Sequence, residues 1–326
     1  MSNRFEPVKI AVAGIGNFGR FHAATLMGLA EAELVGGVGP DADSRAAFQE
    51  LAPAVPVWAD IDTALKECDA EAWIVATTTR AHIAVARQIL EAGKHVLLEK
   101  PIADNVKDAE SLTPLVSDDS NNLMMGHIVL FNSEFRELRA QIEKRGAPQY
   151  IDAVRHRGTS TLEAFPGESP FHLTMVHDLY CVQVLVNGAE PSRFSGQTAC
   201  TPTGEINLAL GQLQWDNGIT ASLTASFMSP PGMYDDGFDR LEVFGDGWSA
   251  RLLPNSRPFE LWDAQAQSPM GSEIRAEGAG PSGMMAEEHR CFCRVVRGLE
   301  SVPLGARYKD AIQLLRWIDH LENTAC

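Results

Sequence analysis

The feature that most limits how this chain can fold is a glycine-rich turn between an apolar strand and a helix, close to the start of the sequence. A mostly apolar segment at residues 8–13 runs into Gly-Ile-Gly-Asn-Phe-Gly, and a helical segment follows over residues 20–29. In that setting Gly14 permits the tight turn, Gly16 lets the backbone approach a pyrophosphate, and Gly19 lets the helix pack closely on the strand. The helix N-terminus offers its unpaired N–H groups to the phosphates. We therefore expect a dinucleotide to be bound by Gly14, Ile15, Gly16, Asn17, Phe18 and Gly19. The alternative is a glycine turn without a ligand.

The alternation of strand and helix continues through the first third of the chain. We expect further strands at residues 33–38, 57–58, 72–76, 95–98 and 123–126, separated by helical segments. Strands joined by helices of this length form a parallel sheet with right-handed crossovers. Residues 1–126 are therefore predicted to form a doubly wound α/β domain of the Rossmann type, which binds a dinucleotide.

The choice between NAD and NADP stays open in the sequence. The acidic residue that holds the adenosine ribose is expected ~20 positions after the glycine motif. Asp41 lies 22 residues beyond Gly19, while Pro40 occupies the position of the acid in the tightest alignment. Arg45 is placed equally well to face a 2′-phosphate or to be an ordinary solvated helix residue.

The second part of the chain, residues 127–326, has a different pattern. Helical segments at 133–144 and 171–186 are followed by strands at 192–198, 206–215, 219–227, 239–244, 248–253 and 259–262 with no helix between them. Asp216-Asn217-Gly218 and Gly245-Asp246-Gly247 indicate hairpin turns. We expect an α+β domain on an open, mostly antiparallel sheet that binds substrate and supports a homodimer or homotetramer. Two closing helices are predicted at 284–298 and 307–322, the last of which can pack back on the first domain.

Composition narrows the class of protein further. Hydrophobic residues make up 45% and charged residues 21%, as in soluble globular proteins. No stretch approaches the ~20 apolar residues of a membrane span, and the N-terminus has no apolar core of a signal peptide, so we expect a cytoplasmic protein without a membrane partner. A net charge of −16 repels nucleic acid. The six scattered cysteines indicate neither a disulfide framework nor a metal site.

Two predicted strands end in residues that carry chemistry. Thr77-Thr78 follow the strand at 72–76, and Glu99-Lys100-Pro101 follow the strand at 95–98. Because ligands bind at the carboxyl ends of parallel strands, Lys100 is expected at the cleft, where a lysine can donate to a substrate oxygen. The alternative is a surface lysine on an edge loop. We also predict a cis Lys100–Pro101 peptide, since a proline at a strand end can fix a sharp turn that faces a ligand.

Together these motifs resemble the Gfo/Idh/MocA family, which includes glucose–fructose oxidoreductase and inositol dehydrogenase. The resemblance rests on Gly14-x-Gly16-x-x-Gly19, Ala92-Gly93-Lys94-His95-Val96 and Glu99-Lys100-Pro101, and it extends over essentially the whole chain. It implies a Rossmann domain with a substrate domain, a bound NAD or NADP, and hydride transfer at a carbinol carbon of a sugar, cyclitol or related polyol.

The resemblance also implies roles for individual residues. Lys100 would polarise the substrate oxygen, and His177 would be the general acid/base. Thr77, Thr78 and His82 would line the nicotinamide, and Glu99 would lie near its ribose. His127 and Asn132 are candidates for the substrate pocket. The alternative for His127 is a structural histidine, and for His82 a helix-capping one.

The chain departs from the family pattern around its predicted acid/base. Many family dehydrogenases have an aspartate four residues before the histidine, where this chain has Leu173, and an acid is common where it has Tyr180. With α-helical spacing only Thr174 shares the face of His177. This pattern is compatible with a dehydrogenase whose proton relay is rewired, with His172 as a candidate. It is equally compatible with a regulatory protein that senses cofactor or sugar without turnover.

Overall fold

The structure is a computed structural model that describes residues 6–233, 237–256, 261–262, 266–267 and 281–325. It divides into two compact units, the first formed by Met1–Phe131 with Ser272–Ile312 and the second by Asn132–Gly271 with Gln313–Cys326. The sequence predicted domains of residues 1–126 and 127–326, with the last helix able to pack back on the first domain. In the structure the chain leaves the first unit, builds most of the second, and then contributes another segment to each.

The first unit is built on a six-stranded parallel sheet with the order β3-β2-β1-β4-β5-β6. Its strands are β1 Val8–Ala13, β2 Ala32–Val38, β3 Val57–Trp58, β4 Ala72–Val75, β5 His95–Glu99 and β6 Leu123–Gly126. The residues of β4 and β6 are buried throughout, as expected for parallel strands that are covered on both faces. The strand order reverses beside β1, which is where doubly wound sheets bind their ligands. The Rossmann prediction is confirmed.

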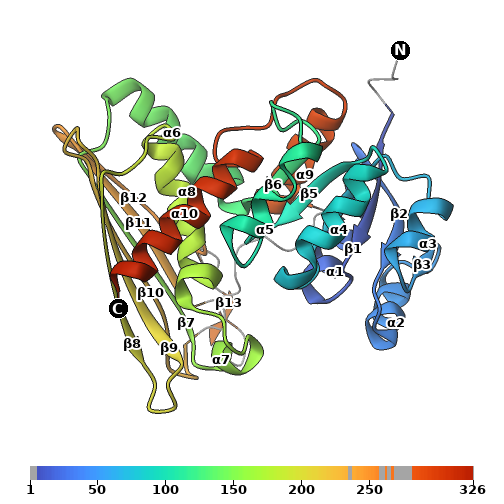
Figure 1. The fold of residues 1–326 in the computed structure, drawn as a ribbon, viewed down its shortest axis with the longest axis horizontal. Helices are drawn as coiled ribbons and strands as arrows, with labels where there is room; N and C mark the ends of the chain where they lie inside the picture. Colours follow the sequence, from blue (N-terminus) through green and yellow to red (C-terminus); the bar gives the residue numbers. More distant parts are fainter. Residues whose placement is uncertain (1–5, 234–236, 257–260, 263–265, 268–280, 326) are drawn as a thin grey trace. The chain divides into compact units, whose positions relative to one another are not determined.

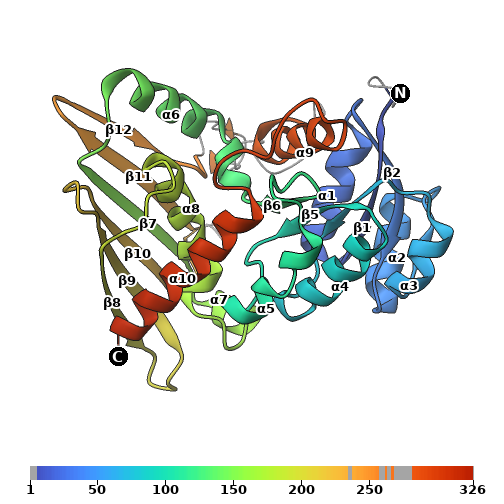
Figure 2. The same ribbon diagram turned by 45° about the horizontal axis from the view of Figure 1, so that its top comes forward.

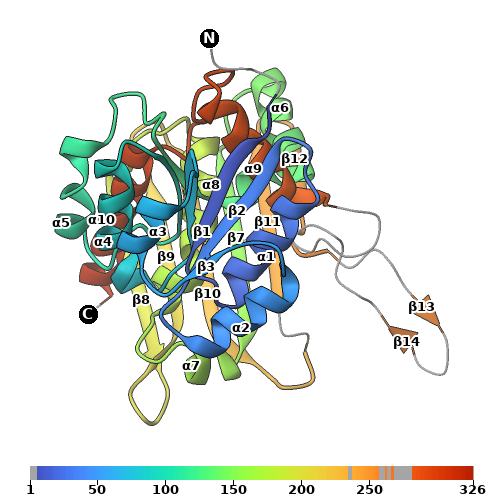
Figure 3. The ribbon, with the colours of Figure 1, turned by 90° about the vertical axis from the view of Figure 1, so that its right-hand side faces the viewer.

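Helices cover both faces of this sheet (Figure 3). One face carries α1 (Asn17–Met27), α2 (Ala42–Leu51) and α9 (Gly283–Val296). The other face carries α3 (Ile61–Glu67), α4 (Thr79–Glu91) and α5 (Val106–Glu110). The helix predicted for residues 106–117 ends early, at Glu110, and a 3₁₀ turn over Thr113–Leu115 follows with Pro114 in its first turn. Proline lacks the N–H that a continuing α-helix needs.

The second unit is built on a six-stranded sheet with the order β12-β11-β7-β10-β9-β8. Its strands are β7 Tyr150–Gly158, β8 Arg193–Cys200, β9 Ile206–Gln214, β10 Thr220–Ser229, β11 Phe238–Gly245 and β12 Trp248–Leu252. All neighbours are antiparallel except β7 and β10. The prediction of a mostly antiparallel sheet is therefore confirmed. Of the strand predicted at 259–262, residues 259–260 lie outside the described residues, and Leu261–Trp262 form the short strand β13, which pairs with β14, Ala266–Gln267.

Helices of the second unit lie on one face of its sheet. Figure 1 shows α8 (Val176–Leu185) and the C-terminal part of α10 (Tyr308–Thr324) on this face. The packing is close, because a Cβ added at Gly196 would lie 2.0 Å from the carbonyl oxygen of Leu321. Figure 2 shows α6 (Ser133–Arg145) beside β12 at the edge of the same sheet.

The helix predicted over residues 171–186 is not continuous. A π-helical turn, Phe171–Met175, precedes α8, and the N–H of Val176 donates to the carbonyl of Phe171, five residues back. This wider turn changes the angular spacing of its residues, on which the prediction that Thr174 shares a face with His177 depended. The Thr174 hydroxyl donates instead to the carbonyl of Pro170. The short helix α7 (Ser160–Ala164) was not predicted at all.

Among the residues that the structure describes, no helix has both the length and the apolar character needed to cross a membrane.

Candidate functional site

The glycine turn after β1 has the shape that a dinucleotide requires. Gly14 has a positive φ of 94°, and a Cβ at Gly19 would lie 1.8 Å from the Gly14 carbonyl oxygen, so both positions need glycine. A Cβ at Gly16 would meet no atom within 4 Å, which leaves open space above the backbone at this position. Gly16 is also the N-cap of α1, and no side chain caps the helix there. The N–H groups of Asn17 and its neighbours are thus available to phosphate oxygens, and the turn fits NAD.

The loop after β2 contains Asp41 and Arg45, which the sequence left as alternatives for the adenosine ribose. Asp41 is exposed and is the N-cap of α2, where one carboxylate oxygen accepts the N–H of Ser44 at 2.7 Å. The resulting hydrogen bonds lower the pKa of Asp41. Arg45 turns back onto the loop and donates through Nη1 to the carbonyl oxygens of Gly39 and Pro40 at 2.8 and 2.7 Å. Its guanidinium therefore holds the backbone of this loop.

The loop after β4 leads into α4, which also begins without a side-chain cap, at Thr78. Thr77 is half-buried and Thr78 exposed, at the carboxyl end of the strand as predicted. His82, in the first turn of α4, is buried, and its two ring nitrogens lie 2.7 Å from the Pro101 carbonyl oxygen and 3.2 Å from the Thr77 carbonyl oxygen. Burial lowers the pKa of His82 below its ordinary value. His82 thus links the loops after β4 and β5.

Glu99 and Lys100 lie where β5 ends. The Lys100–Pro101 peptide is cis, as predicted. Glu99 is buried, and one of its carboxylate oxygens accepts the Lys100 backbone N–H at 3.2 Å. Its other oxygen lies so close to β6 that a Cβ at Gly126 would be 2.6 Å away. Lys100 is half-buried at the carboxyl edge of the sheet, where the sequence placed it.

Glu99 is also one end of a buried chain of polar side chains that the sequence analysis did not find. His22 Nε2 lies 3.2 Å from Glu99 Oε1, and His22 Nδ1 lies 2.8 Å from His289 Nε2. Neither oxygen of the neighbouring Glu288 has a hydrogen-bond partner among the described residues. Burial and the charge of Glu99 raise the pKa of Glu288 well above its ordinary value, so this carboxyl is protonated.

His22, Glu288 and His289 have the composition of a metal site, with ligand atoms within 4.8 Å of one another. The distance between the two imidazoles argues for a hydrogen bond instead. Two nitrogens bound to one zinc ion at ~2.0–2.1 Å in tetrahedral geometry would be ~3.3 Å apart, whereas these are 2.8 Å apart. The ring centroids are 5.0 Å apart, which is close to the nitrogen–nitrogen distance plus the two ring radii, so the rings meet edge to edge.

Two predicted pocket residues serve the local structure of their units. His127 is buried, and its Nδ1–H donates to the carbonyl of Gly305. Burial lowers the pKa of His127 to about 4, so the ring is neutral at physiological pH. Asn132 is the N-cap of α6, where its side-chain oxygen accepts the N–H of Phe135 at 3.0 Å.

In the second unit His177 lies in the first turn of α8 and is half-buried. Its Nδ1 lies 2.7 Å from the hydroxyl oxygen of Tyr180, one helical turn further on. The other candidate, His172, lies on the π-helical turn, with Nε2 3.4 Å from a carboxylate oxygen of Glu322 in α10. Burial lowers the pKa of His172, but Glu322 together with the charges of Glu168 and Asp319 raises it, so the net shift is upward. His172 therefore has its carboxylate partner in α10.

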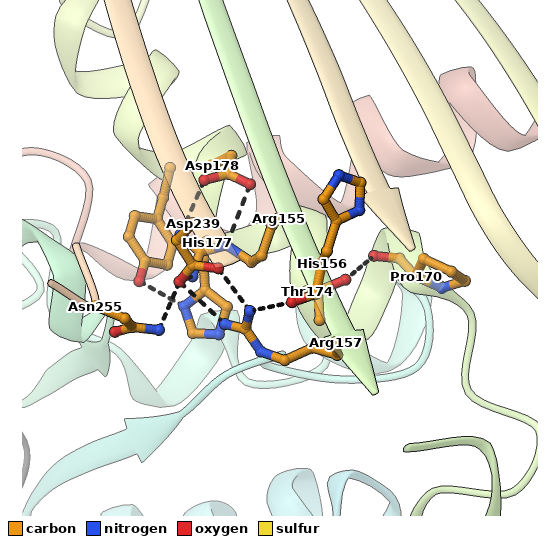
Figure 4. A network of polar contacts seen from close by, with 10 residues as sticks. Arg155, His156, Arg157, Pro170, Thr174, His177, Asp178, Asp239 and Asn255 are labelled. Atoms are coloured by element: carbon orange, nitrogen blue, oxygen red, sulfur yellow. Dashed lines mark hydrogen bonds and ion pairs between the residues drawn. The ribbon is translucent and has the colours of Figure 1, made fainter. Parts of the chain in front are cut away.

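Behind His177 lies a buried network of two arginines and two aspartates (Figure 4). Arg155 in β7 donates to both oxygens of Asp178, at 3.2 and 2.9 Å, and to Asp239 in β11 at 2.5 Å. Arg157 also donates to both oxygens of Asp239, and Asn255 donates to one of them. Burial lowers the pKa of Arg155, but Asp178 and Asp239 together raise it above its ordinary value. The network therefore fixes α8 against the sheet with its charges balanced.

Comparison with known proteins decides the family. Residues 8–127 match the model of an oxidoreductase family with an NAD-binding Rossmann fold, GFO_IDH_MocA. A 4-carboxy-2-hydroxymuconate-6-semialdehyde dehydrogenase of Sphingobium sp. is 31% identical over 227 residues, which cover 68% of this chain and 72% of that protein. The chain belongs to the Gfo/Idh/MocA family.

Other similarities extend over more of the chain. The inositol 2-dehydrogenase 1 of Saccharopolyspora erythraea is 29% identical over 304 residues, which cover 84% of this chain and 88% of that protein. A solved scyllo-inositol dehydrogenase from Lactobacillus casei, with bound NAD(H) and scyllo-inositol, superposes with a TM-score of 0.82. It is 17% identical and covers 98% of this chain and 96% of that one, so it shows that the Gfo/Idh/MocA fold extends over both units.

For this member of the Gfo/Idh/MocA family, sequence reasoning missed the partners of the predicted residues more often than their positions. Tyr180 was noted only because it occupies a position where relatives commonly have an acidic residue. One signal for the arginine network was available, because Ile151, Ala153 and Arg155 alternate on the buried face of β7. An arginine on a buried face requires carboxylate partners.

Proposed function

We propose that this protein is an NAD(P)-dependent dehydrogenase that transfers a hydride between the nicotinamide cofactor and a carbinol carbon of a sugar, cyclitol or related polyol. Membership of an oxidoreductase family with an NAD-binding Rossmann fold supports the reaction type. The relatives named as inositol dehydrogenases support the substrate class.

The observation that carries the proposal is the position of Lys100. It follows β5 at the carboxyl edge of the parallel sheet, where the uncapped N-terminus of α1 follows β1 and Thr77 follows β4. A phosphate-binding turn and an ammonium group on one edge are what dehydrogenation of an alcohol requires: one holds the cofactor and the other contacts the substrate oxygen.

Each side chain then has a chemical task. Bound NAD⁺ supplies the acceptor for the hydride that leaves the carbinol carbon. Lys100 donates a hydrogen bond to the substrate oxygen and stabilises the negative charge that develops on it. His177 accepts the proton of the substrate hydroxyl and returns it in the reverse direction. Asp41 would hold the adenosine ribose of a bound cofactor, because it follows β2 at the carboxyl edge of the parallel sheet.

The charge balance of the second unit supports an uncharged substrate. The guanidinium groups of Arg155 and Arg157 are paired with Asp178 and Asp239, so this network has no net charge to attract a carboxylate. We therefore favour a neutral polyol or cyclitol over a sugar acid.

Replacing Lys100 with methionine tests the proposal. Turnover, followed by the absorbance of the reduced nicotinamide with a panel of cyclitols, aldoses and sugar acids, should fall by ~10²- to 10⁴-fold, as it does when a group that assists proton transfer is lost. The dissociation constant for NAD⁺ should stay within ~2-fold, because Lys100 follows β5, which β4 separates from β1 and its glycine turn. Lys94→Met is the matched control, since Lys94 precedes the same strand at its other end.

A normal rate in Lys100→Met would remove Lys100 from the mechanism. Cofactor binding by the wild-type protein without redox change across the panel would favour the second function, a sensor that uses a cofactor or sugar as a signal.

We further propose that the protein is a homodimer or homotetramer that assembles through the sheet of the second unit. Among the described residues of that unit, no helix lies on the face opposite α8 (Figure 1). That face carries half-buried Thr220, Ser222 and Thr224 of β10. Light scattering of the purified protein would give its mass.

A further inference from the structure

The hydrogen bond between His177 and Tyr180 has no role in the reaction as described so far. Nδ1 of His177 and the hydroxyl oxygen of Tyr180 are 2.7 Å apart, which is a short distance for this type of bond. Their rings are nearly perpendicular, with centroids 5.6 Å apart and an interplanar angle of 71°. Tyr180 has no exposed surface, whereas His177 is half-buried. A buried phenol thus holds one side of a half-buried ring.

The surroundings of Tyr180 limit its movement. Asp178, two residues earlier in α8, is tied to Arg155 by two hydrogen bonds, and Arg155 in turn is tied to Asp239 in β11. Consequently the helical turn that carries His177 and Tyr180 is fixed to two strands of the sheet.

The direction of the bond follows from the task of His177. A histidine that accepts a proton at Nε2 must carry its own hydrogen on Nδ1. In that tautomer Nδ1–H donates to the Tyr180 hydroxyl oxygen. A free histidine side chain in water favours the opposite tautomer, with hydrogen on Nε2. Because a phenol hydroxyl can donate or accept a hydrogen bond, the proposed task of His177 requires the Tyr180 hydroxyl oxygen to accept the bond from Nδ1–H.

We propose that Tyr180 is a positioning residue that holds His177 in the Nδ1–H tautomer, in the role that a carboxylate has in many relatives. This inference rests on the proposed function. In the oxidation direction the substrate hydroxyl gives its proton to His177 Nε2 while the carbinol carbon gives its hydride to NAD⁺, so an alcohol becomes a ketone and an imidazole becomes an imidazolium. Tyr180 itself neither gains nor loses a proton.

A neutral phenol and a carboxylate have different consequences for pH dependence. A carboxylate beside a histidine stabilises the imidazolium and raises the pKa of the ring. A phenol, which ionises only near ~10, orients the ring without adding a negative charge. Activity in the oxidation direction should therefore persist to lower pH than in a relative with an aspartate partner, and this pH limit should rise if a carboxylate is introduced.

Nitrogen NMR of His177 in the complete protein tests the inference without any substrate. The wild-type ring should show hydrogen on Nδ1 and none on Nε2. Tyr180→Phe should shift the ring toward the Nε2–H tautomer. Tyr308→Phe is the matched control, because Tyr308 is another buried tyrosine, with its hydroxyl bonded to Thr113 and Ala109 in the first unit. It should leave the His177 signals unchanged. A wild-type ring with hydrogen on Nε2 would overturn the inference, even if Tyr180→Phe fails to fold.

Kinetics on the substrate found for the wild type gives the second measurement. Tyr180→Phe should lower kcat by ~10- to 100-fold, which is smaller than the effect of losing the proton-transfer group itself. KM should change by less than ~3-fold. Unchanged kcat together with a shifted tautomer would contradict a positioning role. A wild-type ring in the Nδ1–H form without turnover on any substrate would instead count against the proposed function and leave the tautomer assignment intact.

Discussion

Glu288 is a carboxyl group that water does not reach. It is fully buried in α9, neither of its oxygens has a hydrogen-bond partner among the described residues, and its pKa is raised well above the ordinary value. The folded protein therefore keeps the proton at pH values where the unfolded chain has released it. Above the ordinary pKa of a glutamic acid, ionisation favours the unfolded chain, so stability falls as the pH rises toward the raised pKa.

Glu288→Gln should remove this dependence on pH. The free energy of unfolding of the variant relative to wild type should increase as the pH rises above about 5, by about 1.4 kcal/mol for each unit by which the pKa of Glu288 is raised. Urea unfolding at several pH values measures it. Glu287→Gln is the control, because Glu287 is partly exposed and pairs with Arg290 at the surface. A difference that does not change with pH would mean that Glu288 is ionised in the folded protein.

At this scale the sequence predicted residues whose role is local and missed those whose role depends on distant partners. The glycines of the phosphate turn and the cis peptide at Pro101 obey rules that a few neighbouring residues decide. His82 and His127 were located, but their partners Pro101 and Gly305 lie 19 and 178 residues away. No spacing rule connects such residues, so a predicted ligand contact and a structural hydrogen bond could not be distinguished.

At the scale of elements, the turn from β1 to α1 separates two functions of glycine. Gly19 is required by packing, because a Cβ there would collide with the Gly14 carbonyl. Gly16 has an ordinary φ of −65° and open space around its Cβ position. The fold therefore does not need glycine at position 16. Close approach of the cofactor phosphates to the backbone does need it.

Replacing each glycine with alanine should give opposite results. Gly16→Ala should change the free energy of unfolding by less than about 0.5 kcal/mol, as for a substitution without a clash, and should weaken NAD⁺ binding by ~10-fold or more as the methyl group displaces the pyrophosphate. Gly19→Ala should destabilise the protein by about 2 kcal/mol or more, since the backbone must move. Calorimetric titration and thermal unfolding measure both. Normal NAD⁺ affinity in Gly16→Ala would show that the pyrophosphate lies elsewhere.

The predicted elements were correct where one periodicity holds and wrong where it changes. Both sheets follow from runs of apolar and alternating residues. The π-helical turn before α8 was missed because periodicity assumes equal spacing, and the extra residue of a π-turn is stabilised by packing around Phe171 and Met175, which are both buried. The position of Tyr180 was examined only for a carboxylate, and its hydroxyl is the group that contacts His177.

At the scale of the whole molecule, the first unit is assembled from two distant parts of the chain. Segment 128–131 and helix α1 both pack against α9, and His22 reaches His289 across 267 residues. The side of α9 that contains Met285 and Phe292 is buried. The sequence placed the domain boundary near residue 126, where the pattern of strands and helices changes. Nothing at that boundary indicates that a later segment of the chain returns to the first unit.

A chain ending at residue 131 should therefore fail to unfold cooperatively on heating, because the surface of α1 that α9 covers is left apolar and exposed. A chain in which residues 6–131 are joined through a Gly/Ser linker to residues 281–312 should recover a single transition. Circular dichroism during thermal unfolding distinguishes the two. A cooperative transition in the shorter chain would show that α9 is dispensable for the first unit.

The discontinuous first unit also sets an order of events during protein synthesis. A ribosome releases the six strands of the Rossmann sheet early, but α9 leaves only after the strands of the second sheet have been made. The nucleotide-binding unit therefore lacks α9 through most of translation, and the surface that α9 will cover is exposed to solvent or to chaperones. The second unit also gains its last segment late. Because α9 packs against α1, which begins at the glycine turn, the cofactor can be held firmly only when synthesis of the chain is nearly complete.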